Sequence, residues 1–172
     1  MEFWQVVHVL GGYESKICDF INKDSRNIAF IPKKKKVFRK RGINKVDESV
    51  LFANYVFVKT KMEFFEFIEY VQLFLVGIEG FIKLLKHDNV GTESLLPEEI
   101  DFLRRFLNEN FIVDESFGIL EGDSVIVLDG PLVGCESLIT KIDRHKRLAW
   151  IQFSMFGEIR TISVSLEIIS KK

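Results

Sequence analysis

Residues 122–134 have the sequence GDSVIVLDGPLVG, in which a β-prone run ends in a turn rich in glycine and proline. The β-prone run is Ser124–Leu128. Within the turn, Pro131 restricts the backbone and Gly130 can adopt positive φ without steric cost. Three more short β-prone runs, separated by turn residues, follow at 137–142, 148–153 and 159–164. Short strands and turns in this succession predict a small all-β barrel over residues 121–172.

Residues 1–107 have a different pattern, in which β-prone and helix-prone segments alternate. Phe3–Leu10 is a continuous β-prone run, typical of a buried central strand. Further β-prone runs lie at 29–32, 50–59 and 80–85, and apolar residues recur at helical spacing in 13–21, 62–75 and 97–107. This order predicts an α+β fold with an antiparallel or mixed sheet flanked by helices. Residues 108–120 have no clear period, so we expect a linker between the two domains there.

Charge is distributed in patches along this chain of 172 residues, although its formal net charge is only −1. Seven of the nine residues from 33 to 41 are basic: Lys33, Lys34, Lys35, Lys36, Arg39, Lys40 and Arg41. We expect a hairpin with charged arms, with residues 42–48 as its turn. Such a density of cations is self-repelling unless an anion is near, so the run is either a solvated charged surface or a binding site for the phosphates of a nucleic acid. Phe38, between the cations, is expected to pack in the sheet; the alternative is stacking on an unpaired base.

Residue types that carry catalysis or bind metals are scattered. His8, His87 and His145 fall in different predicted elements, and Cys18 and Cys135 match no metal or redox spacing. We therefore expect no catalytic residues, no metal, no cofactor and no enzymatic activity. No apolar run approaches the ~20 residues of a membrane span, and the first residues lack the features of a secretory signal. A monomeric, cytoplasmic protein without a membrane segment is the expectation.

Ordered motifs in both halves resemble those of the NusG family of transcription elongation factors. The C-terminal motifs are similar to those of a KOW domain: Gly122-Asp123-Ser124-Val125, Gly130-Pro131-Leu132-Val133-Gly134 and Phe156-Gly157. Positions similar to the NusG N-terminal domain are Trp4 with Val6-Val7, Gly12-Tyr13-Glu14, Ile31-Pro32, Tyr55-Val56-Phe57-Val58, Gly80-Phe81 and Leu96-Pro97. The resemblance implies a polymerase-binding domain over residues 1–107 and a KOW barrel over residues 121–172.

The family resemblance also implies how the N-terminal domain binds its partner. Family members contact the clamp helices of the largest RNA polymerase subunit through an aromatic surface. The matching positions are Trp4, His8, Phe52, Tyr55 and Phe57. Contact is favoured for Phe52 and Tyr55, and the alternative for Trp4, Phe52 and Phe57 is an ordinary position in the core. Aromatic side chains with a polar group are frequent hot spots of such interfaces. We expect Phe52→Ala to abolish polymerase binding while the fold survives.

Departures from the general NusG pattern indicate a specialised member. Phe52-Ala53-Asn54-Tyr55 replaces the usual segment before the central strand, while Cys135 and Glu158 replace residues through which general NusG meets ribosomal protein S10. The chain looks most like LoaP, an antiterminator group recruited by a hairpin in the nascent RNA. The resemblance adds a second set of nucleic-acid-binding candidates in the barrel: Lys141, Arg144, His145, Lys146, Arg147 and Arg160. Non-template DNA is a further candidate partner of the basic hairpin.

Two other functions are compatible with the same sequence. One is a general NusG that couples polymerase to the ribosome or to Rho. The other is a ribosome-associated, RNA-binding KOW protein without polymerase contact. Binding to an isolated clamp-helix fragment separates this last alternative from the first two.

Overall fold

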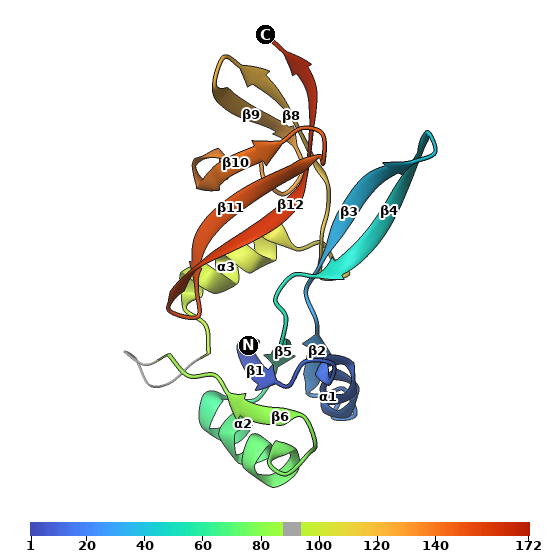
Figure 1. Cartoon of the computed structure of the whole chain (residues 1–172). Coiled ribbons are helices and arrows are strands. Elements are labelled where there is room, and N and C mark those ends of the chain that lie inside the picture. Colours follow the sequence, from blue (N-terminus) through green and yellow to red (C-terminus); the bar gives the residue numbers. More distant parts are fainter. Residues whose placement is uncertain (88–93) are drawn as a thin grey trace. The chain divides into compact units, whose positions relative to one another are not determined.

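Residues 1–87 and 94–172 are described by the computed structural model, shown in Figure 1. The chain divides into two units, each built from two separate stretches of sequence. Unit 1 comprises Met1–Pro32 and Phe52–Asp101, and unit 2 comprises Lys33–Leu51 and Phe102–Lys172. Residues 33–51, which the sequence assigns to the first domain, therefore belong to the unit that contains the C-terminal strands.

Unit 1 is built on a four-stranded sheet in the order β2-β5-β1-β6. Its strands are β1 (Phe3–Val9), β2 (Asn27–Phe30), β5 (Tyr55–Thr60) and β6 (Phe81–Leu84). Every pairing within the sheet is antiparallel. β1 is a central strand, as its continuous apolar run predicts, and β2 is an edge strand that ends before Pro32. The predicted α+β class is confirmed for this unit.

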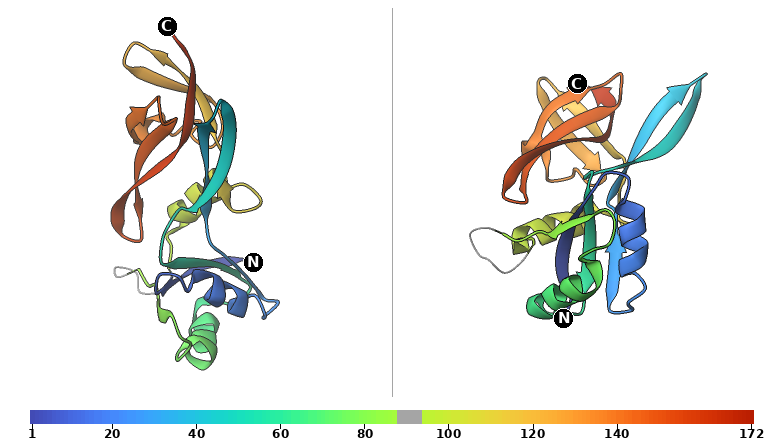
Figure 2. Two further views of the ribbon diagram at one scale, coloured as in Figure 1. Left: turned by 45° about the vertical axis from the view of Figure 1, so that its right-hand side comes forward. Right: turned by 60° about the horizontal axis from the view of Figure 1, so that its bottom comes forward.

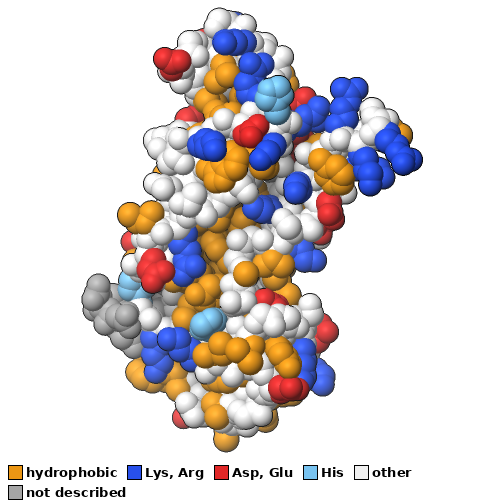
Figure 3. Space-filling view, viewed as in Figure 1, with side chains coloured by type: hydrophobic (Ala, Val, Ile, Leu, Met, Phe, Trp, Pro, Cys, Tyr) orange, Lys and Arg blue, Asp and Glu red, His pale blue; other side chains and the backbone are white. Residues whose placement is uncertain are grey.

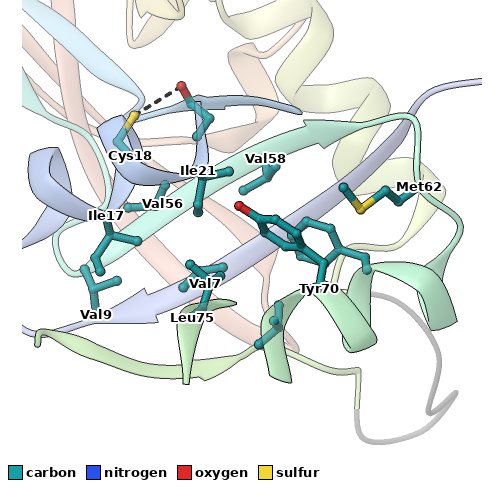
Figure 4. Packing of buried hydrophobic residues seen from close by; sticks show 13 residues of the cluster. Val7, Val9, Ile17, Cys18, Ile21, Val56, Val58, Met62, Tyr70 and Leu75 are labelled. Carbon is teal, nitrogen blue, oxygen red and sulfur yellow. Dashed lines mark hydrogen bonds between the residues drawn. The ribbon is translucent and has the colours of Figure 1, made fainter. Parts of the chain in front are cut away.

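Two helical segments cover one face of the sheet of unit 1. They are α1 (Glu14–Ile21) and α2 (Phe64–Tyr70), which continues into the π-helix η1 (Val71–Leu75). Their apolar side chains pack on alternate residues of β1 and β5 (Figure 4): Val7, Val9, Ile17, Ile21, Val56, Val58, Phe67, Tyr70 and Leu75. A third helix, α3 (Pro97–Phe106), begins as predicted at Pro97 and has Glu98 and Glu99 in its first turn.

Unit 2 contains a five-stranded sheet in the order β10-β11-β12-β8-β9. The strands are β8 (Ser116–Glu121), β9 (Ser124–Asp129), β10 (Ile139–Asp143), β11 (Leu148–Met155) and β12 (Glu158–Lys171), with the 3₁₀ turn η2 (Glu136–Leu138) before β10. β8 falls within residues 108–120, where the sequence predicts a linker. It pairs in parallel with the end of β12 and antiparallel with β9. The pairing with β12 is distant in sequence, so the local pattern of residues 108–120 carried no sign of it.

The basic segment forms a hairpin of β3 (Lys33–Lys40) and β4 (Ile43–Val50), which β7 (Ile112–Val113) extends to a three-stranded sheet. The expected turn over residues 42–48 is shorter than predicted. It consists of Arg41 and Gly42, both with positive φ (53° and 78°), as in a two-residue hairpin turn. Figure 1 and the right-hand view of Figure 2 show this hairpin extending away from the five-stranded sheet of the same unit.

Candidate functional site

The base of the basic hairpin is attached to the C-terminal strands of unit 2 by specific hydrogen bonds. The backbone N–H of Lys33 donates to the Phe111 carbonyl at 3.0 Å. The buried Ser165 hydroxyl donates to the Lys35 carbonyl at 2.7 Å. These bonds connect β3 to β7 and β12, and they explain why residues 33–51 belong to unit 2.

Three of the seven cations contact groups at this base. Lys34 Nζ donates to the Ser163 carbonyl at 2.6 Å and to its hydroxyl at 2.9 Å. Burial lowers the pKa of Lys34. Lys35 Nζ lies 2.5 Å from an Asp114 carboxylate oxygen, and this hydrogen bond lowers the pKa of Asp114. Lys33 Nζ is 4.0 Å from Glu48 Oε2. These three side chains therefore stabilise the attachment of the hairpin as well as adding positive charge.

The outer half of the hairpin presents cations to solvent. Lys36, Arg39, Lys40, Arg41 and, on β4, Lys45 are all exposed. Arg39 Nε also donates to the Gly42 carbonyl at 3.4 Å, which orients the guanidinium along the turn. Exposed cations at this density attract phosphates and release their counterions on binding.

The turn between β10 and β11 forms a second basic site. The backbone N–H of Lys146 donates to Asp143 Oδ1 at 2.9 Å, and this bond lowers the pKa of Asp143. Arg147 has φ 53°, the same left-handed conformation that Arg41 adopts in the turn of the β3–β4 hairpin. A cavity of about 750 Å³ opens here, lined by Lys141, Ile142, Asp143, Arg144, His145, Arg147, Glu167 and Ile168.

Arg147 connects the two basic sites, although they are far apart in the sequence. Its Nη1 donates to Asn44 Oδ1 at 3.5 Å, across 103 positions of the chain, and its Nη2 lies 3.8 Å from Glu167 Oε1. Asn44 is paired with Arg39 in the β3–β4 hairpin. Lys and Arg atoms accordingly gather on the hairpin and on the neighbouring part of the five-stranded sheet (Figure 3). We call this combined surface, formed by residues 36–45 and 141–147, the basic surface.

Arg160 does not belong to the basic surface. It is paired with Phe153 on the β11–β12 ribbon, whereas Leu148, next to Arg147, is paired with Ser165. Five residues of strand separate the two positions by about 17 Å. The Arg160 guanidinium lies 4.9 Å from the ring centroid of Phe156 and 3.3 Å from Glu158. The structure therefore brings Lys141, Arg144, His145 and Arg147 together around one cavity, but places Arg160 elsewhere in the unit.

The candidate polymerase-contact residues lie together in unit 1. By strand alternation Trp4, His8, Tyr55 and Phe57 face away from α1 and α2, since Val7, Val56 and Val58 face these helices. Phe52 precedes β5, and its ring lies 5.7 Å from that of Phe57. Trp4, Phe52 and Phe57 are only 3%, 4% and 0% exposed. They belong to a ring cluster in which Phe30 lies 5.6 Å from Trp4 and 5.7 Å from Phe57. Three of the five candidates are thus buried in this conformation.

His8 and Tyr55 differ from the other three candidates. Both are half-buried, and their rings stack at 5.1 Å with an interplanar angle of 24°. Each of these residues has a polar group at the end of a flat ring. That combination suits an interface that is partly apolar and partly wet.

Other site types receive no support from the described residues. Within residues 1–87 and 94–172, no group of three or more His, Cys, Asp or Glu is arranged to hold a metal ion. In the same ranges, no helix is long and apolar enough to cross a membrane. Cys18 is buried and its Sγ donates to the Ala29 carbonyl at 3.1 Å (Figure 4). Burial raises the pKa of this thiol to about 11, so the thiolate is scarce at neutral pH.

Comparisons with known proteins agree over nearly the whole chain. The sequence profile of a family described as "Transcription termination factor nusG" matches residues 2–102. The "Transcription termination/antitermination protein NusG" of Bacillus subtilis is 26% identical over 176 residues, covering 98% of this chain and 97% of that protein. The protein of the same name from Halalkalibacterium halodurans is 28% identical over 178 residues, with the same coverage. A solved structure of Thermotoga maritima NusG, reported for its domain interaction, shares the fold with a TM-score of 0.51 at 18% identity, over 98% of this chain and 94% of that one.

Proposed function

The chain belongs to the NusG family of transcription termination and antitermination factors, and we propose that it promotes processive elongation as an antiterminator recruited by the nascent transcript. In this proposal, residues 1–107 bind RNA polymerase and residues 121–172 form a KOW barrel that meets an RNA hairpin, as in LoaP. Binding the elongating polymerase more tightly than the paused one shifts the equilibrium toward elongation, because only differential affinity can do so.

The aromatic residues of unit 1 support the polymerase-binding part of the proposal. His8 and Tyr55 form the accessible part of the candidate surface, and their stacking gives a flat, rigid contact with little entropy left to lose. The buried rings of Trp4, Phe52 and Phe57 pack with Phe30 in one aromatic cluster, and in this proposal they become accessible when the partner binds. The partner in this proposal is the pair of clamp helices of the largest polymerase subunit.

One observation carries the RNA-binding part of the proposal: two basic segments distant in sequence form a single surface. The Arg147–Asn44 contact joins them, and Arg144 and His145 line the cavity beside it. An A-form RNA helix is recognised mostly through its backbone and shape. A wide cationic surface with a recess satisfies that requirement without reading individual base edges.

A salt titration of RNA binding tests the proposal. We would measure the affinity of the full chain for a hairpin RNA and for an unstructured RNA of equal length, between low and physiological salt. We expect a preference for the hairpin that persists at physiological salt. The triple variant Arg39→Ala/Lys40→Ala/Arg41→Ala should lower the slope of log affinity against log salt by about 0.9 for each phosphate that is no longer neutralised. Lys61→Ala, which removes an exposed cation of unit 1, is the matched control.

A second candidate function is that of a general NusG. The full-length similarity to two proteins of that name favours it, since nearly the whole length of those proteins is covered. Equal, weak binding of both RNAs that disappears at physiological salt would select this role over recruitment by a hairpin. If a clamp-helix fragment failed to bind the chain, both proposals would be wrong, and a ribosome-associated RNA-binding protein would be the better description.

A further inference from the structure

The outward face of the β3–β4 hairpin has a side-chain pattern that the binding of phosphates alone does not explain. Residues directly opposite each other in an antiparallel pair share a face, so the register assigns each side chain to one face. One face carries Lys35, Val37 and Asn44, which contact the rest of unit 2 or are buried. The other face contacts Ser163 at its base through Lys34, and toward the turn it carries three further pairs: Lys36 with Asp47, Phe38 with Lys45, and Lys40 with Ile43.

Phe38 lies at the centre of this outward face. Its neighbour Val37 is 6% exposed, whereas Phe38 is 36% exposed. All eight residues of β4, the strand paired with the strand of Phe38, are exposed. The Phe38 ring is therefore not covered by a buried apolar side chain of β4. Ile43, 64% exposed, adjoins Phe38 diagonally on the same face. Phe38 and Ile43 thus form an exposed apolar surface, although a polar residue such as lysine or threonine would be compatible with the strand at these positions.

Cations surround this apolar surface on three sides. Lys45 lies directly across from Phe38, where opposite Cβ atoms are about 5 Å apart. Lys36 and Lys40 are two residues away in either direction along β3, which is about 7 Å. The one acid on this part of the face is Asp47, opposite Lys36. An aromatic ring between backbone-binding cations is the arrangement by which proteins hold single-stranded nucleic acid, with a base stacked on the ring and phosphates on the lysines.

We infer that Phe38 is a stacking platform for an unpaired base, and that Lys36, Lys40 and Lys45 bind the phosphates on either side of that base. The inference rests on the proposed nucleic-acid role of unit 2 and adds a ligand class to it: an unpaired strand at Phe38, beside the hairpin RNA bound across the basic surface. Unpaired RNA and unpaired DNA present the same chemistry, since both offer a base with a π-face and a charged backbone. The sequence pattern favoured packing of Phe38 in the sheet, and the exposure of the ring is what supports stacking.

The test uses the full chain with fluorescently labelled oligo(U), oligo(dT) and an abasic DNA of equal length. Base–aromatic stacking of about 1–3 kcal/mol corresponds to a loss of about 5- to 150-fold in affinity for Phe38→Ala. Phe38→Trp should keep the affinity, and its indole fluorescence should be quenched by oligo(U) or oligo(dT) but not by the abasic strand. Phe38→Leu, which is apolar but has no π-face, should resemble Phe38→Ala. Phe65→Ala, which removes an exposed ring on α2, is the matched control.

The salt dependence of the affinity distinguishes the contribution of the Phe38 ring from that of the lysines. Phe38→Ala should leave the slope of log affinity against log salt unchanged, whereas Lys45→Ala should reduce it by about 0.7, the value for one phosphate of a single strand. If Phe38→Ala binds both oligo(U) and oligo(dT) more weakly than the unmodified chain, the ring stacks on the bases of either strand. If Phe38→Ala binds only one of them more weakly, the ring still stacks on a base, and the strand is the transcript for oligo(U) or displaced DNA for oligo(dT).

Two results would overturn the inference. If Phe38→Ala bound both oligonucleotides as tightly as the unmodified chain, while Lys45→Ala still weakened binding, the platform would be wrong and the proposed nucleic-acid role would stand. If the unmodified chain bound neither oligonucleotide nor hairpin RNA, the proposed role would fail together with the platform. Thermal unfolding of each variant checks that a decrease in affinity does not come from unfolding.

Discussion

Ser165 provides the sharpest test of how the basic hairpin is attached to unit 2. Its side chain is 2% exposed, and its hydroxyl donates to the Lys35 carbonyl at 2.7 Å. Ser165→Ala removes this donor and leaves a partly buried carbonyl without it, which costs about 1–3 kcal/mol. For a chain of this size, Tm falls by about 2–4 °C for each kcal/mol, so we expect a decrease of about 2–12 °C if the units unfold together.

The hairpin should also become more mobile in Ser165→Ala. Backbone amides of β3 (Lys33–Lys40) should exchange with deuterium faster than in the unmodified chain, because the bond to β12 opposes local opening. Affinity for hairpin RNA should decrease as well, since the cations of the β3–β4 hairpin are then less firmly positioned relative to Arg147. Ser154→Ala, which removes an exposed hydroxyl of β11 in the same sheet, is the control and should change neither quantity. An unchanged Tm together with unchanged exchange in β3 would refute the assignment of Ser165 as one of the residues that attach the hairpin.

Three further predictions concern other parts of the molecule. Tyr55→Ala should weaken binding to a clamp-helix fragment in a pull-down or titration with a small decrease in Tm, because only its half-buried ring and the stacking on His8 are lost. Phe52→Ala, at a position only 4% exposed, should also cost about 3–5 kcal/mol of unfolding free energy. Gly80→Ala should destabilise unit 1 by more than about 1–2 kcal/mol in urea unfolding, because left-handed φ alone costs that much. At Gly80, φ is 93° and an added Cβ would lie 2.3 Å from a neighbouring aromatic ring. The pKa of Asp114 is lowered by Lys35, so its contribution to stability is present above the ordinary value of 3.8 and disappears as pH falls through the lowered value. Asp114→Asn should remove that acid-dependent decrease, which is worth less than about 1 kcal/mol for a partly exposed pair, and a urea titration at several pH values would show no difference if the pair contributes nothing.

Local patterns in the sequence were sufficient for most individual elements. The apolar run at residues 3–10 predicted β1, and the helical spacing of apolar residues predicted α1, α2 and α3. These predictions succeeded because an element that buries one side has apolar residues at regular intervals within a short stretch of sequence. The same motifs led to the NusG family, which the comparisons confirm.

Patterns failed where a strand depends on a distant partner. β8 pairs with β12 near the end of the chain, and residues 33–51 are attached to strands that follow them by many residues. The sequence left two environments open for Trp4, Phe52 and Phe57, which are buried in the structure, because an aromatic residue suits a core and a contact surface equally well. No period or spacing in a single sequence distinguishes these two environments.

The sequence by itself determined the chemistry available to this protein: the alternation that makes strands, the turn residues between them, and the density of cations at residues 33–41. Only the tertiary structure decided which of these groups act together. It brought Arg147 to Asn44, left Arg160 on another part of the unit and turned Phe38 outward. The physical reason is range. Backbone propensity and side-chain period act over a few residues, whereas the positions of charged groups depend on pairing between strands that are far apart in the sequence, such as β8 with β12 and β3 with β7.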